Sequence, residues 1–227
     1  AIIEKNGFTA ILLPGPPIEM TAMFEEYVIP YLRSKTNDVL YSYTIKECGI
    51  GESLLETMLL DIIDNQTNPT VATYAKTSCS EVRITAKADS FEKAQNLVKP
   101  IAEEVIKRLG DNVYSTDEKE NIEDALVRLL RKNNLTISVA ESCTGGLTCS
   151  KIVNVGGASE VFKYGFITYA NEAKMKLLGV SKDTLEKYTA VSEKTAREMA
   201  CGAIKESGAD VAVSITGYAG PYDSEDE

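Results

Sequence analysis

The sequence contains no histidine, and this absence excludes several common kinds of catalytic site. A chain without an imidazole cannot form a Ser-His-Asp triad, a Cys-His dyad or a histidine-ligated metal centre. Any general base in this protein must therefore be a lysine, a tyrosine or a carboxylate.

Cysteine is sparse, and its pattern does not indicate pairing. The five cysteines are odd in number, and no two of them are spaced as a metal-binding C-x-x-C pair. This pattern argues against a disulfide framework and against a zinc site. We therefore expect free thiols and no metal-ligating residues.

Long apolar runs and clusters of positive charge are also missing. No apolar run approaches the roughly 20 residues of a membrane-spanning helix, and the first residues lack the pattern of a secretory signal. The formal net charge is −10, with a pI near 4.8 and no local basic patch to attract phosphate backbones. We expect a cytoplasmic protein that has neither a membrane nor a nucleic acid as partner.

The chain has 227 residues, of which 44% are hydrophobic, and this is enough for two compact domains. Residues 1–35 combine a strand-like run at 8–13, a Pro14-Gly15-Pro16-Pro17 turn and a helical stretch at 19–32. This order is typical of the end of an α/β domain rather than of its start. The turn is rigid, and it either marks a domain edge or presents N–H groups to an anion.

Residues 36–115 have the pattern of a small α+β domain. Alternating apolar residues and helical periodicity predict strands at 39–45, 71–74 and 80–88 and helices at 53–63 and 90–109.

Residues 116–227 alternate strands with helices, which predicts a three-layer α/β domain with a mainly parallel sheet. We expect strands at 136–140, 164–169 and 210–215, and helices at 121–132, up to about 153, at 171–178 and at 192–205. All three strands end at polar turns. Ligands collect at the carboxyl ends of strands in such sheets, so we expect a site there.

Ser142 lies where the first of these strands gives way to a helix, and its hydroxyl can be exposed at the edge of the sheet. The backbone N–H groups of the following turn suit an oxyanion or a phosphate, and they belong to Cys143, Thr144, Gly145 and Gly146. The alternative is a helix N-cap, a position that serine and threonine often fill.

Lys174 and Tyr169 are candidate partners of this serine. Lys174 falls one turn into its helix, so its amine can reach back toward the preceding strand end, where partial burial would make it a usable base. The phenol of Tyr169 could bridge serine and lysine or donate to an oxyanion. The alternatives are a solvated lysine, as we expect for Lys176, and a tyrosine that only packs.

The third strand ends at Thr216 and Gly217, which add a hydroxyl and an N–H to the same strand edge or merely cap a loop. Glu141 precedes the candidate nucleophile, and its role is structural, orienting or catalytic.

Three ordered segments together resemble the C-terminal domain of the competence/damage-inducible CinA family. They are Ala140–Gly146 (AESCTGG), Gly165–Lys174 (GFITYANEAK) and Ser214–Gly217 (SITG). Residues 12–20 (LLPGPPIEM) resemble the end of that family's N-terminal domain, which is similar to molybdopterin-binding folds. The segment at 49–53 (GIGES) resembles the family's KH-like connector.

The resemblance implies a nicotinamide-nucleotide amidohydrolase of pyridine-nucleotide salvage, which converts nicotinamide mononucleotide to nicotinate mononucleotide and ammonia. It implies Ser142 as the nucleophile, Tyr169 and Lys174 as its partners, and Thr216 as a further site residue. No cofactor is implied for this reaction. We expect a small-molecule nucleotide substrate and a homo-oligomer.

Two alternatives to the deamidase stay open for the full-length protein. The family's N-terminal domain is associated with metal-dependent ADP-ribose pyrophosphatase activity, but only its last elements are present here, so that activity and its divalent metal are not carried over to this chain. A nucleotide-binding regulatory module without catalysis is the other alternative. The family's C-terminal domain also continues beyond Gly220 and Pro221, with an arginine suited to the substrate phosphate, so we expect the domain to be incomplete in this sequence.

Overall fold

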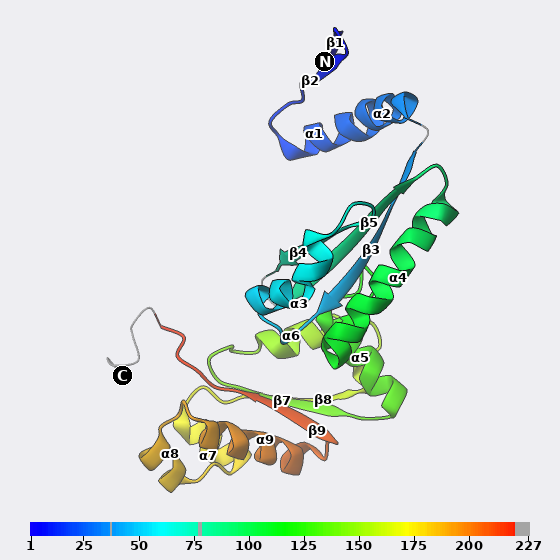
Figure 1. Ribbon diagram of the computed structural model, residues 1–227. Helices are drawn as coiled ribbons and strands as arrows, with labels where there is room; N and C mark the ends of the chain where they lie inside the picture. Colours follow the sequence, from blue (N-terminus) through cyan, green and yellow to red (C-terminus); the bar gives the residue numbers. More distant parts are fainter. Residues whose placement is uncertain (37, 77–78, 221–227) are drawn as a thin grey trace. The chain divides into compact units, whose positions relative to one another are not determined.

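The computed structural model describes residues 1–36, 38–76 and 79–220. Within the chain, residues 1–118 and residues 119–227 form two compact units. Figure 1 shows the helices and strands of each unit. No helix in the described ranges is both long enough and apolar enough to cross a membrane.

The first unit begins with a hairpin of β1 (Ile2–Lys5) and β2 (Phe8–Ile11). Its turn is Asn6-Gly7, and both residues have positive φ, as a tight type I′ turn requires. The predicted helix at 19–32 is observed as α1 (Pro17–Met23), a π-helical turn (Phe24–Val28) and α2 (Ile29–Lys35). Pro30 lies in the first turn of α2 and has no N–H, which accounts for the irregular turn before it.

The rest of the first unit is a four-stranded antiparallel sheet in the order β4-β5-β3-β6. The strands are β3 (Val39–Glu47), β4 (Thr70–Ala75), β5 (Ser80–Ala88) and β6 (Val113–Ser115), and the helices are α3 (Glu52–Asp64) and α4 (Phe91–Leu109). A short 3-10 turn at Gly110–Asn112 leads into β6, a strand that the sequence pattern did not predict.

Alternation along β5 explains how this sheet packs. Val82, Ile84 and Ala86 are fully buried on one face, while the residues between them are partly exposed. They share one core with Leu55 and Leu59 of α3 and with the buried face of α4. The predicted α+β organisation of residues 36–115 is thus present in the structure.

The second unit contains a three-stranded parallel sheet in the order β8-β7-β9. Its elements are α5 (Ile122–Asn133), β7 (Ile137–Glu141), α6 (Leu147–Val153), a 3-10 turn (Ala158–Glu160), β8 (Phe162–Ile167), α7 (Asn171–Leu178), α8 (Lys182–Tyr188), α9 (Glu193–Ser207) and β9 (Val211–Ile215). The predicted α/β class with a parallel sheet is confirmed. Helix α8 was not predicted.

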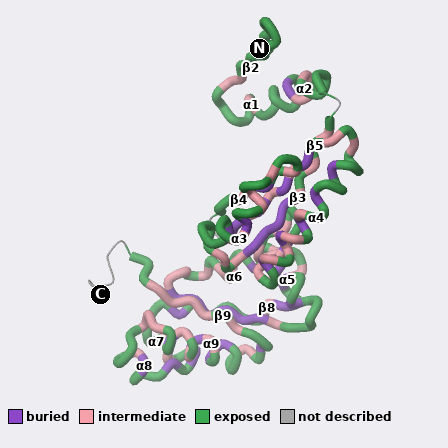
Figure 2. Tube along the Cα trace, viewed as in Figure 1, coloured by how far each residue is buried: buried purple, intermediate pink, exposed green. Residues whose placement is uncertain are grey.

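Helices cover both faces of this sheet. One apolar core joins α5 and α6 to β7, and a second core on the other face joins α7 and α9 to β7. Figure 1 shows α7, α8 and α9 together on one side of the sheet. All five residues of β7 are buried, as the purple central strand in Figure 2 shows.

The close packing of α9 against α7 gives a testable prediction at Gly202. A Cβ at this position would lie 1.9 Å from the carbonyl oxygen of Leu178. Because this oxygen belongs to the backbone, no side-chain rotation can relieve the clash. We expect Gly202→Ala to lower the free energy of unfolding by about 3 kcal/mol or more, measured by urea denaturation. The matched control is Gly156→Ala, because a Cβ at Gly156 would meet nothing within 4 Å. Equal stability of the two variants would contradict this packing.

Candidate active site

The ends of the three parallel strands lie at one edge of the sheet. Glu141, the last residue of β7, is paired with Ile167 of β8 and Ile215 of β9. Just past the strand, the Ser142 N–H donates to the Ile215 carbonyl (2.9 Å), and the Thr168 N–H donates to the Glu141 carbonyl (2.7 Å). These bonds fix the positions of Ser142 and Thr168 relative to the sheet.

Ser142 and Lys174 are in direct contact. The Lys174 Nζ lies 3.0 Å from the Ser142 Oγ, and it also donates to the carbonyls of Thr168 (2.9 Å) and Tyr169 (2.8 Å). The Lys174 side chain is only 1% exposed, although lysines are almost never fully buried without a specific reason. Lys176, two positions further along α7, is exposed. Lys174 is thus not an ordinary solvated lysine.

This environment favours a neutral amine. Burial lowers the pKa of Lys174, and the nearby Cys143 only partly opposes this shift. A neutral amine has two N–H bonds and one lone pair. If the Thr168 and Tyr169 carbonyls accept the two N–H bonds, the lone pair is directed at the third neighbour, the Ser142 hydroxyl. The arrangement can therefore remove a proton from the serine.

Glu141 binds the turn that follows the serine. Its side chain is fully buried, with one carboxylate oxygen accepting the N–H groups of Gly146 (3.0 Å) and Thr148 (3.1 Å) and the other accepting that of Cys149 (2.8 Å). Burial alone would raise the pKa of Glu141, but the hydrogen bonds from Cys149, Thr144 and Thr148 outweigh it and lower the pKa to about 2. The carboxylate is therefore charged at neutral pH.

The bonds to Glu141 change the expected set of anion donors. The Gly146 N–H is occupied by Glu141, and the Gly145 N–H donates to the Ser142 carbonyl (3.1 Å). Within the described ranges, the N–H groups of Cys143 and Thr144 donate to no other group. The expectation that all four N–H groups of residues 143–146 face a ligand is thus narrowed to these two.

The helix-cap alternative for Ser142 and Thr144 is not what the structure shows. The N-cap residue of α6 is Gly146, in a left-handed conformation and without a side-chain cap. The Ser142 hydroxyl instead contacts the Lys174 amine, 3.0 Å away. The Thr144 hydroxyl is buried and contributes to the lowered pKa of Glu141 instead of capping α6.

Tyr169 contacts Lys174 through its backbone and not through its phenol. Strand β8 ends at Ile167, so Tyr169 lies two residues beyond it rather than at its last position. The residue is 72% exposed, and among the described residues its hydroxyl has no hydrogen-bond partner. The predicted bridge between the phenol and the serine–lysine pair is therefore absent from this structure.

Thr216 and Gly217 follow β9 and have different surroundings. Gly217 lies beside Cys143, since a Cβ on Gly217 would be 3.2 Å from the Cys143 sulfur. The Thr216 hydroxyl donates to the Ala190 carbonyl (2.7 Å) in the loop between α8 and α9. Gly217 thus lies next to the turn that follows Ser142, whereas the Thr216 hydroxyl holds a neighbouring loop.

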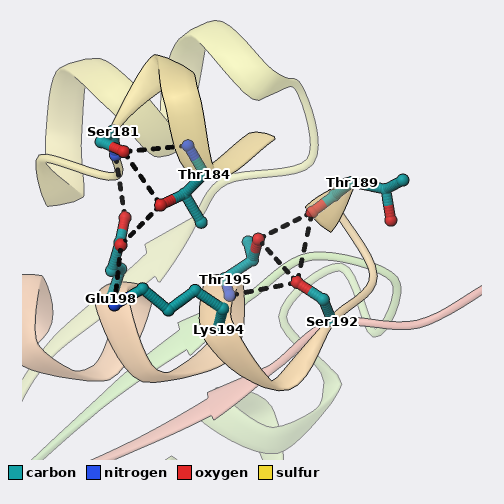
Figure 3. Close-up of polar contacts among 7 residues, drawn as sticks. All are labelled: Ser181, Thr184, Thr189, Ser192, Lys194, Thr195 and Glu198. Carbon is teal, nitrogen blue, oxygen red and sulfur yellow. Dashed lines mark hydrogen bonds and ion pairs between the residues drawn. The ribbon is translucent and has the colours of Figure 1, made fainter. Parts of the chain in front are cut away.

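The loop that Thr216 contacts is fixed at its base by the first turn of α9. The Thr189 carbonyl accepts from the hydroxyls of Thr195 (2.7 Å) and Ser192 (3.4 Å), and Ser192 also caps α9 by accepting the Thr195 N–H (Figure 3). Thr189 itself has a φ of 64°, a conformation that threonine rarely adopts. The bonds to Thr195 and Ser192 hold it there.

Figure 3 also shows how α8 is attached to α9. Glu198 of α9 accepts from the Ser181 N–H (2.9 Å) and from the Thr184 hydroxyl (2.7 Å), while Ser181 caps α8. Lys194 lies 3.7 Å from the same carboxylate. The cluster links the two helices on the face of the sheet that also carries Lys174.

One contributor to the site, Thr168, carries no clear signal in the sequence. Thr168 acts through its carbonyl, which every residue type possesses, so its identity gives no indication of the contact. Glu141 was singled out in the sequence with its role left open, and the structure shows that its carboxylate binds the turn. In the described part of the chain, no group of three or more Cys, Asp or Glu side chains is arranged to hold a metal ion.

Two regions of the chain match models of a single protein family. Residues 119–227 match the CinA C-terminal domain, and residues 42–115 match the KH domain of damage-inducible protein CinA.

Individual relatives carry similar descriptions. The chain is 53% identical over 220 residues to a CinA-like protein of Kosmotoga olearia, which covers 97% of this chain and 53% of that protein. It is 53% identical over 220 residues to a putative competence-damage inducible protein of Clostridium botulinum strain Okra, covering 97% and 54%. The crystal structure of a CinA superfamily protein from Escherichia coli is 47% identical, covers 47% of this chain and 62% of that chain, and has a TM-score of 0.46. The chain spans about half the length of the curated relatives it matches.

Proposed function

The chain belongs to the CinA family, and from this premise we propose that it hydrolyses nicotinamide mononucleotide to nicotinate mononucleotide and ammonia. The substrate is the one that the resemblance of its motifs implies. The observation that supports the chemistry best is the buried contact of 3.0 Å between the Lys174 amine and the Ser142 hydroxyl. A serine beside a lysine that burial favours in its neutral form suits acyl transfer without histidine or metal.

In the proposed first half-reaction, neutral Lys174 takes the proton of Ser142, and the serine oxygen attacks the carboxamide carbon. The N–H groups of Cys143 and Thr144 bind the oxyanion that forms, since they have no other partner in the described ranges. The C–N bond then breaks while protonated Lys174 gives its proton to the departing nitrogen. Ammonia leaves, and Ser142 carries the acyl group as an ester.

The second half-reaction reverses these roles. A water molecule loses a proton to Lys174 and attacks the ester carbon, and the same two N–H groups bind the second oxyanion. The bond to Ser142 breaks, and Lys174 returns the proton to the serine oxygen. The product forms as the carboxylic acid, which loses its remaining proton to solvent to give the carboxylate of nicotinate mononucleotide, and the site is restored.

Tyr169 takes part in this scheme mainly through its carbonyl, which orients Lys174. We expect Tyr169→Phe to keep this bond and the geometry of the serine–lysine pair, because only an exposed hydroxyl is lost. Its loss in kcat should be at least about 100-fold smaller than that of Ser142→Ala, measured by ammonia release. Equal losses in the two variants would assign the phenol a direct part in the chemistry.

We also propose that deamidation needs no cofactor and that the substrate is a free small-molecule nucleotide. Phosphorylated nucleotides are charged and stay within the compartment that makes them, so we infer a cytoplasmic site of action. A homo-oligomer remains our expectation for the assembled protein.

The function is tested by incubating the full-length protein with nicotinamide mononucleotide and following ammonia and nicotinate mononucleotide together. Equal amounts of the two products are expected, with the rate unchanged by a chelator such as EDTA. Binding of the nucleotide without turnover would favour a regulatory module instead, and a large loss with the chelator would point to a metal-dependent reaction.

A further inference from the structure

The turn after Ser142 must supply N–H donors to two negatively charged groups. Glu141 is buried and charged against the N–H groups of Gly146, Thr148 and Cys149, while the proposed reaction develops an oxyanion that needs N–H donors from the same turn. These two groups do not compete, because they use different N–H groups. The position of the Glu141 side chain determines which N–H groups of the turn bind its carboxylate and which stay available for the oxyanion.

We propose that Glu141 is a positioning residue for the oxyanion site: its carboxylate folds the turn so that the N–H groups of Cys143 and Thr144 stay free and point at the oxyanion of the reacting group. This inference rests on the proposed function. Glu141 itself does not touch the reacting atoms.

Both ends of Glu141 are fixed, and this makes it suited to the task. Its backbone is paired with β8 and β9, and its carbonyl accepts the Thr168 N–H. Its side chain reaches forward five to eight residues to the start of α6. The residue therefore connects the rigid strand edge to the far end of the turn and closes the segment between them.

The turn needs such a connection because its own conformation is unusual. Gly145 and Gly146 have φ values of 59° and 106°, so two successive residues lie in a region that only glycine adopts readily. Gly146 is also close to β8, since a Cβ there would lie 3.0 Å from Ile167 Cδ1. Without the carboxylate, three N–H groups would lose their acceptor and this backbone would relax.

A carboxylate is required, and an amide cannot replace it. Both oxygens of Glu141 accept, one from two N–H groups and the other from one. In a glutamine, one of these oxygens becomes an NH₂ group, which would face N–H donors and repel them. Glu141→Gln therefore changes the turn while keeping nearly the same side-chain volume.

The experiment compares Glu141→Gln with the native full-length protein and with Glu172→Gln, an exposed glutamate in the first turn of α7. The readouts are kcat, KM and the Kd of a boronic-acid analogue in which B(OH)₂ replaces the carboxamide of nicotinamide mononucleotide. Boron bonds to the serine oxygen and forms a tetrahedral anion, so its affinity reports on the oxyanion donors. The Kd of the product, nicotinate mononucleotide, reports on ground-state binding alone.

We expect Glu141→Gln to lower kcat and the boronate affinity by on the order of 100-fold each, with KM and the product Kd changed less than about 3-fold. The pH at which activity levels off should not move, because burial and Cys143, and not Glu141, shift the pKa of Lys174. Glu172→Gln should behave as the native protein does. Native boronate affinity in Glu141→Gln, or an equal loss of boronate and product affinity, would overturn the proposal.

Glu141→Asp serves as a second variant if the glutamine variant does not fold. It keeps the charge and shortens the side chain by one carbon, so we expect about a 10-fold loss of kcat and boronate affinity at unchanged KM. Unchanged boronate affinity in this variant would overturn the proposal equally. If the native protein neither turns over the nucleotide nor binds the boronate, the proposed function fails. If the native protein turns over the nucleotide and binds the boronate, and the Glu141 variants do both equally well, only the positioning role fails.

Discussion

Replacing Ser142 by alanine is expected to lower kcat for deamidation by at least about 10⁴-fold, because the acyl-enzyme can no longer form. KM should change less than about 3-fold, since the hydroxyl is buried against Lys174 and contributes little to substrate binding. Loss of one hydrogen bond to a neutral hydroxyl costs about 1 kcal/mol, so the variant should remain folded. Steady-state ammonia release and thermal unfolding measure the two effects.

The matched control for this variant is Ser150→Ala in α6. Ser150 is exposed, and in the described ranges its hydroxyl has no hydrogen-bond partner. We expect native kcat from the control. A Ser142→Ala protein that is folded and keeps more than a tenth of the native rate would remove Ser142 from the mechanism.

Replacing Lys174 is expected to have an effect of similar size. Lys174→Ala should lower kcat by about 10³- to 10⁴-fold, because the proton of Ser142 loses its acceptor and the leaving nitrogen loses its donor. Lys174→Arg should be equally inactive, because a guanidinium stays protonated and has no lone pair to offer. Lys176→Ala is the control on the same helix, and it should retain native activity because this side chain is exposed.

The pH dependence of the native protein tests the same residue without a mutation. At low pH Lys174 is protonated and cannot act as the base, so kcat/KM should rise with pH as the amine loses its proton. Because burial lowers the pKa of Lys174, the rise should level off below the value of about 10.4 for an ordinary lysine. A rate that keeps rising to that value, or that does not depend on pH, would contradict the assignment.

The contact between Ser142 and Lys174 could be predicted because the position of each residue follows from regular structure. Lys174 falls one turn into a helix that follows a strand end, and this position by itself brings its amine back to Ser142. The class of the domain followed from alternating strands and helices, and the parallel sheet confirms it. Both inferences depend on periodicity, which a sequence displays directly.

Other parts of the site depend on contacts that periodicity does not encode. The end of β8 at Ile167, two residues earlier than expected, turns the Thr168 and Tyr169 carbonyls toward Lys174. Which N–H groups of the turn remain free depends on the direction of the Glu141 side chain. Tertiary hydrogen bonds decide both features, and the side-chain types of these residues do not reveal them.

The five cysteines illustrate the same limit. All are free thiols, as their odd number and spacing indicated. Their environments nevertheless differ: burial raises the pKa of Cys149 to about 12, which makes its thiol unreactive, whereas Cys143 directly follows Ser142 and lies close to Lys174. Cys143 is therefore the residue that must be distinguished from Ser142 as the possible carrier of a covalent intermediate.

The most direct test of the serine–lysine mechanism is the mass of the protein quenched with acid during turnover of nicotinamide mononucleotide, followed by mapping of the modified peptide. The mechanism predicts an ester of nicotinate mononucleotide on Ser142, formed together with an equal amount of ammonia and absent from Ser142→Ala. Rapid turnover with the label on Cys143, or with no covalent adduct at any time after mixing, would contradict it.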